Sequence, residues 1–596
     1  MPDDAPALAK PLLLWDGKCG FCKIWVHYFK QLTGDRIDYA TSQQRGAEFP
    51  QIPPADFGKS VQLVQPDGSV VSGGRVFFEI TGHQRIYQAS RPFRWITETA
   101  YKFIATHRNL FYHVTRFTFG TRIEPARFGA TQWIFLRVLA VIYALAFASL
   151  AVQITGLIGQ RGILPLPQFF ESIAQNFGSV RYLAVPSIFW WNASDGALTG
   201  ICWAGVALAA ALLIGRLERL ILILLWVLYL SLCSAGQDFL GFQWDALLLE
   251  TGFLAIFLGR SKTVVWLFRW LVFRVFFLSG AVKLLSHDPT WRDFTALRYH
   301  FHTQPLPTVF AWFADHLPDW FLRLSTQGMF FIELVAPFLI YLPRRLRMLG
   351  ASLLITLEVL IAITGNYGYF NLLTIALCLF LFDDRVFSFK RFPRRDVTVP
   401  SRPECAVSIL LAIFILTLGL TRMFETFRGA PAPEPLRTLA RYTAPLQIVN
   451  PYGLFAVMTT TRPEIILEGS RDGETWQAYE FPYKPGALNR APRWAAPYQP
   501  RLDWQMWFAA LGNVQSNPWF ASLAVRLLEG SPEVGALLAS NPFGDRPPRY
   551  IRATIFEYSF TDGATRARTG EWWKREPRGQ YLPPVGLRSQ IQPAAF

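Results

Sequence analysis

The sequence predicts a polytopic α-helical membrane protein with a small α/β domain at the N-terminal end and a β-rich domain at the C-terminal end. Three observations lead to this fold class. Hydrophobic residues make up 52% of the 596 residues and charged residues only 17%, whereas soluble proteins are roughly a quarter charged. Long apolar runs fill the middle of the chain. Basic residues are concentrated in the short loops between these runs.

The apolar runs are candidates for about nine membrane spans, because a helix that crosses ~30 Å of hydrocarbon needs about 20 residues. The fourth and eighth runs are short, so their boundaries are poorly defined. The predicted spans are residues 133–157, 197–215, 220–236, 245–259, 263–285, 325–342, 346–364, 369–382 and 404–421.

The loops indicate the topology independently. Basic residues precede the first span and follow the second, fourth, sixth and eighth, whereas the connections 237–244 and 365–368 contain no Lys or Arg. The positive-inside rule then places the N-terminus in the cytosol and the C-terminal domain outside. Residues 1–15 contain no stretch long enough for a secretory signal, which agrees with a cytosolic N-terminus. The basic loop residues include Arg108, Arg116, Arg122, Arg127, Arg216, Arg219, Arg260, Lys262, Arg344, Arg345, Arg347, Arg385, Lys390, Arg391, Arg394, Arg395 and Arg402.

The net charge of +16 is compatible with nucleic-acid binding in principle. Because the basic residues are concentrated beside the apolar runs, membrane topology explains the charge better. We therefore expect the lipid bilayer as a partner and no nucleic acid.

The predicted domains are residues 1–115, 116–424 and 445–596, with a Pro-containing linker at 425–444. In the first we expect strands at 12–15 and 36–40, a helix from Cys19, a hairpin of 60–65 with 69–72, and a closing helix at 101–112. In the last we expect a hairpin of 465–468 with 476–481, a strand at 550–560, and helices at 502–511 and 518–528.

Cys19 and Cys22 form a Cys-x-x-Cys pair at the predicted start of a helix. The positive end of the helix dipole stabilises a thiolate there, so Cys19 is the candidate nucleophile and Cys22 the resolving thiol. A structural or weakly metal-binding pair, or an idle motif, is the alternative interpretation.

The run WDGKCGFC at residues 15–22, with YKFIA at 101–105 and Arg108, resembles the DCC family of thiol-disulfide oxidoreductases. The resemblance implies a thioredoxin-like domain, with Asp16 and Arg108 near the cysteine pair and an unidentified thiol redox partner.

The chain from about residue 128 to 585 is similar to the lipase maturation factor family. This resemblance implies a membrane factor that helps secreted lipases to fold and assemble in the endoplasmic reticulum, and hence a lipase-like client. The fused cytosolic domain indicates a bacterial member in an inner membrane. The matching stretches are KLL (283–285), DPTW (288–291), YH (299–300), QPLP (304–307), FNLLT (370–374), NPYGLF (450–455), PRLDWQMW (500–507), NPF (541–543) and PPRY (547–550).

Several ionisable residues lie in or beside the predicted spans, where they are costly and usually paired or functional. We expect four in the outer half of the membrane, Arg274 near the middle, and a loop just outside that carries further polar residues. One interpretation is a polar site that opens outward, and the other is structural ion pairing with the loop as a cap. The outer-half residues are Glu250, Glu333, Glu358 and Lys283, and the loop residues are His287, Asp288, Trp291, His300 and His302.

Lys283, followed by Asp288 and Trp291, distantly resembles a segment of vitamin-K-dependent carboxylases in which the lysine is a base. That resemblance implies a base role for Lys283, whereas a lysine at the membrane edge can also simply extend to the interface. His300 and His302 lack a third ligand at suitable spacing, so we expect no metal ion. We expect no cofactor either.

Two classes of function remain open. The first is a maturation or folding factor for secreted clients. The second is a membrane enzyme, either an oxidoreductase through Cys19 and Cys22 or an enzyme with Lys283 as a base. Cys202 and Cys233 are predicted at equal height on neighbouring spans, where buried free thiols are expected and a disulfide is the alternative.

Overall fold

The computed structural model describes residues 8–121, 123–259, 261–387 and 401–587. It contains two compact units. The first consists of the described residues up to 127 with residues 341–349 and 383–385, and the second contains the others. The loop residues Arg122 and Arg260, and the basic residues between 388 and 400, lie outside the described residues.

The first unit is built on a four-stranded sheet with the order β2-β1-β3-β4. The central strand β1 (Leu12–Trp15) pairs in parallel with β2 (Asp38–Thr41) and antiparallel with β3 (Gln62–Val64), and β3 pairs antiparallel with β4 (Val70–Ser72). Three consecutive leucines in β1 are buried, as is typical of a strand that is covered on both faces. The helices are α1 (Gly20–Thr33), α2 (Ser42–Arg45), α3 (Pro54–Lys59), α4 (Arg75–Ile80), α5 (Gln84–Gln88), α6 (Arg91–Thr106) and α7 (Arg108–Thr118).

The prediction of one closing helix at 101–112 is wrong, because the structure has two helices that meet at His107. The backbone of His107 leaves the helical region, with φ −106° and ψ 37°. Its N–H bonds the Phe103 carbonyl at 3.1 Å and its Nδ1 approaches the same oxygen at 2.9 Å. This cap ends α6 and allows α7 to begin at Arg108 in a new direction.

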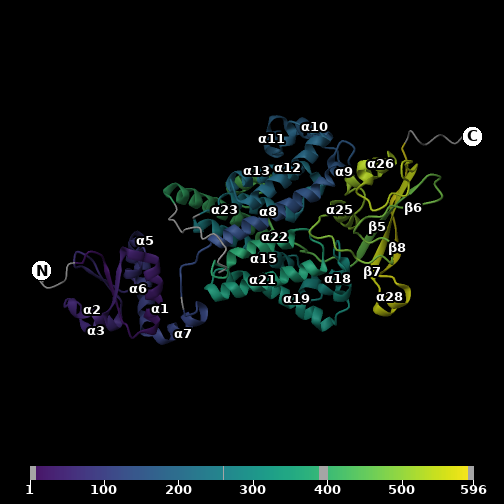
Figure 1. Cartoon of the computed structure of the whole chain (residues 1–596). Helices are drawn as coiled ribbons and strands as arrows, with labels where there is room; N and C mark the ends of the chain where they lie inside the picture. Colours follow the sequence, from purple (N-terminus) through teal and green to yellow (C-terminus); the bar gives the residue numbers. More distant parts are fainter. Residues whose placement is uncertain (1–7, 122, 260, 388–400, 588–596) are drawn as a thin grey trace, which may run out of the picture. The chain divides into compact units, whose positions relative to one another are not determined.

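Among the described residues of the chain, six helices are long and apolar enough to cross a membrane. They coincide with the first, second, third, fifth, seventh and ninth predicted spans. Helix α15 is the most deeply buried and contacts α14, α19, α20, α22 and α23, so it forms the centre of the helical region (Figure 1). The six are α8 (Gly129–Ala151), α12 (Asp195–Ile214), α13 (Glu218–Ala235), α15 (Lys262–Leu285), α21 (Arg344–Thr364) and α23 (Arg402–Arg428).

The count of nine spans is not confirmed. The fourth, sixth and eighth predicted spans correspond to α14 (Gln243–Ile256), to α19 (Asp319–Leu334) followed by α20 (Ala336–Leu339), and to α22 (Phe370–Cys378). Most of α14 and α22 is buried in protein, so these helices need not match the hydrocarbon thickness. The sixth span is interrupted at Val335, beside Pro337, which cannot continue a helical hydrogen-bond ladder.

Shorter helices in the connections escaped the sequence prediction, because none has a long apolar run. They are α9 (Ile154–Ile158), α10 (Leu166–Phe177), α11 (Arg181–Ala184), α16 (Pro289–Arg292), α17 (Leu297–Thr303), α18 (Val309–Asp315) and α24 (Leu436–Thr443).

The C-terminal sheet domain has four antiparallel strands in the order β6-β5-β7-β8. They are β5 (Arg462–Ser470), β6 (Gln477–Ala478), β7 (Tyr550–Phe560) and β8 (Trp573–Val585). The first three were predicted, whereas β8 was not, because this edge strand is mostly polar and contains three prolines. The helices are α25 (Arg501–Ala510), α26 (Pro518–Leu528), α27 (Pro532–Gly535) and α28 (Gly563–Thr569).

The sheet domain and the helical region belong to the same unit, and three helices meet the sheet domain at their C-terminal ends. After α8, Gln153 Nε2 donates to the Gln499 carbonyl at 2.8 Å. After α15, Asp288 accepts from the Met458 N–H at 2.7 Å, and after α21, Asn366 Nδ2 donates to the Arg493 carbonyl at 2.8 Å. These three helices therefore run in the same direction.

Candidate functional site

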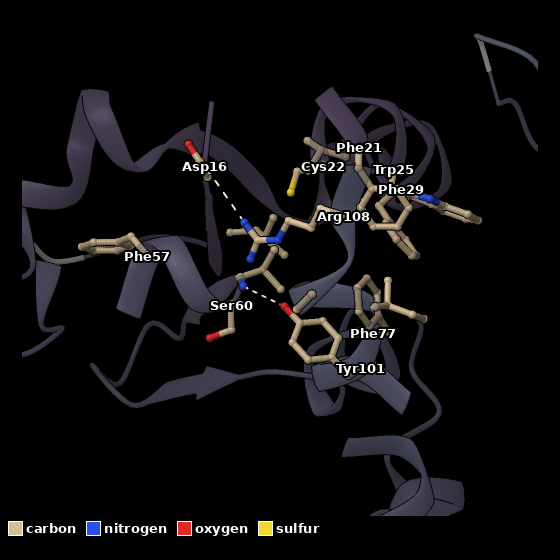
Figure 2. A pocket seen from close by; sticks show the side chains of 15 residues that line it. Asp16, Phe21, Cys22, Trp25, Phe29, Phe57, Ser60, Phe77, Tyr101 and Arg108 are labelled. Carbon is tan, nitrogen blue, oxygen red and sulfur yellow. Dashed lines mark hydrogen bonds and ion pairs between the residues drawn. The ribbon is translucent and has the colours of Figure 1, made fainter. Parts of the chain in front are cut away.

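The cysteine pair of the first unit borders an apolar cavity of about 300 Å³ (Figure 2). Cys19 caps the N-terminus of α1, where its sulfur accepts the Cys22 N–H at 3.1 Å, and the two sulfurs form a disulfide. Cys22 lines the cavity. The apolar walls come from Leu13, Phe21, Trp25, Val26, Phe29, Phe57, Val61, Phe77, Tyr101, Ile104 and Ala105.

Asp16 and Arg108 supply polar groups at this cavity. The Arg108 guanidinium lies 3.9 Å from the Asp16 carboxylate and donates to the Lys59 carbonyl at 2.9 Å. Gln43 donates to the other Asp16 oxygen at 2.9 Å, which fixes the carboxylate (Figure 2 shows Asp16 and Arg108). The site therefore combines an apolar wall with one ion pair beside the Cys19–Cys22 sulfur pair.

The second unit contains a cavity of about 330 Å³ that is lined by Lys283 and by two of the predicted carboxyl groups, Glu333 and Glu358. Lys283 Nζ donates to both Glu333 oxygens, at 2.7 and 2.8 Å, and to the Ser279 carbonyl at 3.2 Å. Glu358 accepts a hydrogen bond of 2.7 Å from Asn371 Nδ2. Trp291 and His300 also line this cavity, so it gathers five of the residues predicted from the sequence.

Glu250 and Arg274 do not line that cavity. They form a fully buried ion pair with each other, and Glu250 also accepts from the Asn450 N–H at 3.0 Å and from the Tyr452 hydroxyl at 2.8 Å. Arg274 donates to the Asn450 carbonyl at 3.2 Å. Of the two interpretations offered by the sequence, structural ion pairing describes this pair, which joins α14 and α15 to the segment before the sheet.

The loop residues predicted beside the spans also have different surroundings: Trp291 and His300 line the Lys283 cavity, whereas Asp288 and His302 do not. Asp288 caps α16 through the Thr290 N–H at 2.7 Å, and the indole of Trp291 donates to the Phe455 carbonyl at 3.0 Å. His302 Nδ1 lies 2.8 Å from Asp315. Within the described residues, no group of three His, Cys, Asp or Glu side chains is arranged to hold a metal ion.

His300 faces the cavity with its ring edge-on to Phe455 at 5.2 Å between centroids. Burial, together with the positive charge of Lys283, lowers its pKa from 6.5 to about 4. The folded chain thus takes up this proton only at a lower pH than the unfolded chain does. The stability contributed by neutral His300 is complete above about pH 6.5 and is lost as the pH falls through about 4.

We therefore expect the thermal unfolding midpoint to decrease when the pH is lowered from about 7 to about 4.5, with His300→Phe weakening this dependence. His83, which is exposed in the first unit, gives the matched control His83→Phe. An equal pH dependence in the native chain and in His300→Phe would contradict this assignment.

A fully buried ion pair between the sheet domain and the helical region was not predicted. Arg501, the first residue of α25, donates to the two Asp245 oxygens at 2.8 and 2.9 Å and to the Phe239 carbonyl at 2.7 Å. The Tyr369 hydroxyl donates to Asp245 at 3.1 Å. Both charged side chains are fully buried. The sequence offered one indication of a buried charge, which is an arginine at the start of an apolar helix with two tryptophans. Its partner could not be found in this way, because Asp245 lies 256 residues away.

Cys202 and Cys233 are free and buried, in agreement with the expected state. Among the residues described, neither thiol lines the cavity beside Cys22 or the cavity beside Lys283.

An aromatic cleft of about 420 Å³ lies where the sheet domain meets the helical region. Trp504, Trp507 and Phe508 of α25 contribute one wall, and Phe242 and Trp244 contribute the other. Phe508, Val457 and Leu511 keep 42%, 67% and 43% of their surface exposed, so the cleft continues onto an apolar surface. Exposed apolar surface beside a cleft is typical of a protein-contact site.

The six long apolar helices and the attached sheet domain define an integral membrane protein with a folded extramembrane domain. Residues 130–389 match the family model for the lipase maturation factor transmembrane domain, and residues 448–583 match the lipase maturation factor C-terminal domain. The chain belongs to the lipase maturation factor family. Residues 1–129 lie outside both models.

Individual relatives agree with this assignment. The chain is 36% identical to human lipase maturation factor 2 and 35% identical to that of Xenopus tropicalis, with 76% of this chain and 82% of each relative covered. It is 34% identical to bovine lipase maturation factor 1, with 78% of this chain and 90% of the relative covered. No solved structure matches.

Proposed function

We propose that the chain is a membrane-embedded maturation factor for secreted lipase-like clients. The observation that carries this proposal is membership of the lipase maturation factor family over both the helical region and the sheet domain. The helical region anchors the sheet domain at the membrane, and the sheet domain holds the client outside. The additional N-terminal unit favours a bacterial inner membrane as the location.

The proposed topology has the N-terminal unit in the cytosol and the sheet domain on the opposite side. Support comes from the common direction of α8, α15 and α21, whose C-terminal ends all reach the sheet domain. The alternation of basic loops supports the same orientation.

Reporter fusions test this topology. Fusions after Arg127 and after Arg395 are expected to report the cytosol, and fusions after Asn366 and after Pro435 the outside. An outside signal from the Arg395 fusion would contradict the arrangement.

The aromatic cleft is the proposed client contact, because its walls are apolar and one edge is exposed. A photoreactive amino acid at Leu511 should crosslink to a secreted lipase of the same organism when both are produced together. The control position is Val525, which is 40% exposed on α26 but does not line the cleft. Equal lipase adducts from both positions, or none from Leu511, would refute this contact.

We propose thiol-disulfide exchange as a second function, located in the first unit. The sheet order, with a parallel β1–β2 pair followed by two antiparallel neighbours, is compatible with a thioredoxin-like fold. The Cys19 thiolate attacks a protein disulfide, forms a mixed disulfide and releases one partner thiolate. Cys22 then attacks the mixed disulfide, which releases the second partner thiol and leaves the Cys19–Cys22 disulfide.

Cys22→Ser should therefore trap a mixed disulfide at Cys19. In the reduced native chain, an alkylating probe at neutral pH should label Cys19 faster than free cysteine, because the helix N-terminus favours the thiolate. Cys405→Ser removes a partly exposed thiol elsewhere and serves as the control. Labelling no faster than a model thiol, without a trapped species, would favour an idle motif.

The alternative in which Lys283 acts as a base has less support. The three donors of a lysine ammonium are engaged by the two Glu333 oxygens and the Ser279 carbonyl. A base needs a free lone pair, which this arrangement disfavours. The geometry fits a structural ion pair better.

A further inference from the structure

The Lys283 cavity has the walls of a ligand site. Its volume of about 330 Å³ falls in the range of roughly 300–1,000 Å³ that is typical of small-molecule pockets. Phe276 of α15, Leu322 of α19 and Ile361 of α21 contribute apolar walls from three helices, and Phe455 closes the space from the segment before the sheet domain. An apolar chain in this cavity would contact side chains from three helices and the side chain of Phe455.

The wall of this cavity continues onto the apolar outer surface of the helices. Leu317, Phe321 and Leu360 all line the cavity, yet they remain 40%, 41% and 56% exposed. Leu360 lies on α21, one of the six helices long and apolar enough to cross a membrane, so we assign the surface around it to lipid. A molecule dissolved in the bilayer can therefore enter sideways without crossing water.

The cavity contains one more carboxyl group than charged basic side chains. Lys283 is paired with Glu333 through both carboxylate oxygens, so this pair is neutral as a whole. Glu358 is only 4% exposed, and it accepts a hydrogen bond from the neutral amide of Asn371. In the part of the chain that the structure describes, no basic side chain forms an ion pair with Glu358. His300 is uncharged near neutral pH because its pKa is lowered to about 4.

A buried carboxyl group without a cation takes up a proton in an apolar setting, whereas an ammonium ion beside it stabilises the carboxylate form. We propose that the cavity binds an amphiphile that has an apolar chain and a primary ammonium head group, with the ammonium paired to Glu358. The apolar chain occupies the space among Phe276, Leu322 and Ile361. This inference does not depend on the identity of the protein client.

Photolabelling of the full chain in phosphatidylcholine nanodiscs tests the proposal. Three probes carry the same diazirine-bearing alkyl chain and end in an ammonium, a hydroxyl or a carboxylate group. We expect the ammonium probe to label the segments 276–283 and 357–361 about tenfold more than the hydroxyl probe, a preference of about 1.4 kcal/mol. The carboxylate probe should label them least. Equal labelling by the ammonium and hydroxyl probes, or the strongest labelling by the carboxylate probe, would overturn the proposal.

Two variants test whether Glu358 causes the stronger labelling by the ammonium probe. Glu358→Gln keeps an oxygen for Asn371 but removes the charge, so the ammonium probe should lose its advantage while hydroxyl labelling stays the same. Glu425→Gln, at a carboxylate of α23 that pairs with Arg422, is the matched control and should keep the preference. Retention of the preference in Glu358→Gln would contradict the assigned pairing. Because the comparison of head groups uses the native chain, the test does not require either variant to fold.

A fourth probe distinguishes the source of the ammonium group. A phosphatidylethanolamine with the same diazirine chain should label the cavity if a bilayer lipid is the occupant. Labelling by the single-chain amine alone would identify a free amine. Both results support the ammonium site.

Discussion

Arg501→Met should destabilise the chain by about 3–5 kcal/mol, because it leaves the Asp245 carboxylate buried without its cation. Both partners are fully buried, and the guanidinium makes two bonds to the carboxylate and a third to the Phe239 carbonyl. The pair also joins the sheet domain to α14. We therefore expect a lower thermal midpoint of the purified full chain and faster proteolysis between the helical region and the sheet domain.

The double variant Asp245→Asn with Arg501→Met should be more stable than Arg501→Met alone. It removes both charges, and the asparagine oxygen still accepts from the Tyr369 hydroxyl. The control is Arg552→Met, whose ion pair with Glu468 is 33% and 18% exposed, and which should cost at most about 1 kcal/mol. Equal losses for Arg501→Met and Arg552→Met would show that the buried pair has no special role.

Arg274→Met should have a loss of similar size, about 3–5 kcal/mol, for the same physical reason. Glu250 would keep the Tyr452 hydroxyl and the Asn450 N–H as donors but would lose its cation. Because Asn450 and Tyr452 belong to the segment before the sheet, that segment should become sensitive in the variant to chymotrypsin, which cleaves after Tyr452 and Phe455. The fraction of monodisperse protein in detergent gives a second measure.

The matched control for this variant is Arg422→Met on α23. Arg422 pairs with Glu425 at 3.1 Å, but both side chains are about a quarter exposed. The control should leave the protease pattern unchanged. A native pattern in Arg274→Met would instead mean that the buried pair does not hold the segment.

The sequence predicted the elements that are determined by neighbouring residues in the chain. The six long helices follow from apolar length, and the start of α1 follows from a strand, a turn and the Cys-x-x-Cys motif. The positions of Asp16 and Arg108 beside Cys22 came from a family resemblance, and the structure brings these residues to one cavity.

Features that depend on tertiary contacts could not be predicted. The length rule for spans does not apply to α14 and α22, because protein rather than lipid surrounds them. Nothing near Arg501 indicates that Asp245 is its partner. The predicted outer polar residues also look alike in sequence, but only the structure separates the Glu250–Arg274 pair from the cavity of Lys283, Glu333 and Glu358.

The proposed role in lipase maturation is tested most directly by the activity of a secreted lipase per mole of secreted enzyme. This quantity should be compared between cells of the source organism that contain the chain and cells that lack it. We expect it to fall several-fold when the chain is absent, and to recover when the native chain is returned but not when Arg501→Met is returned. Unchanged activity per mole in cells without the chain would contradict the proposed function.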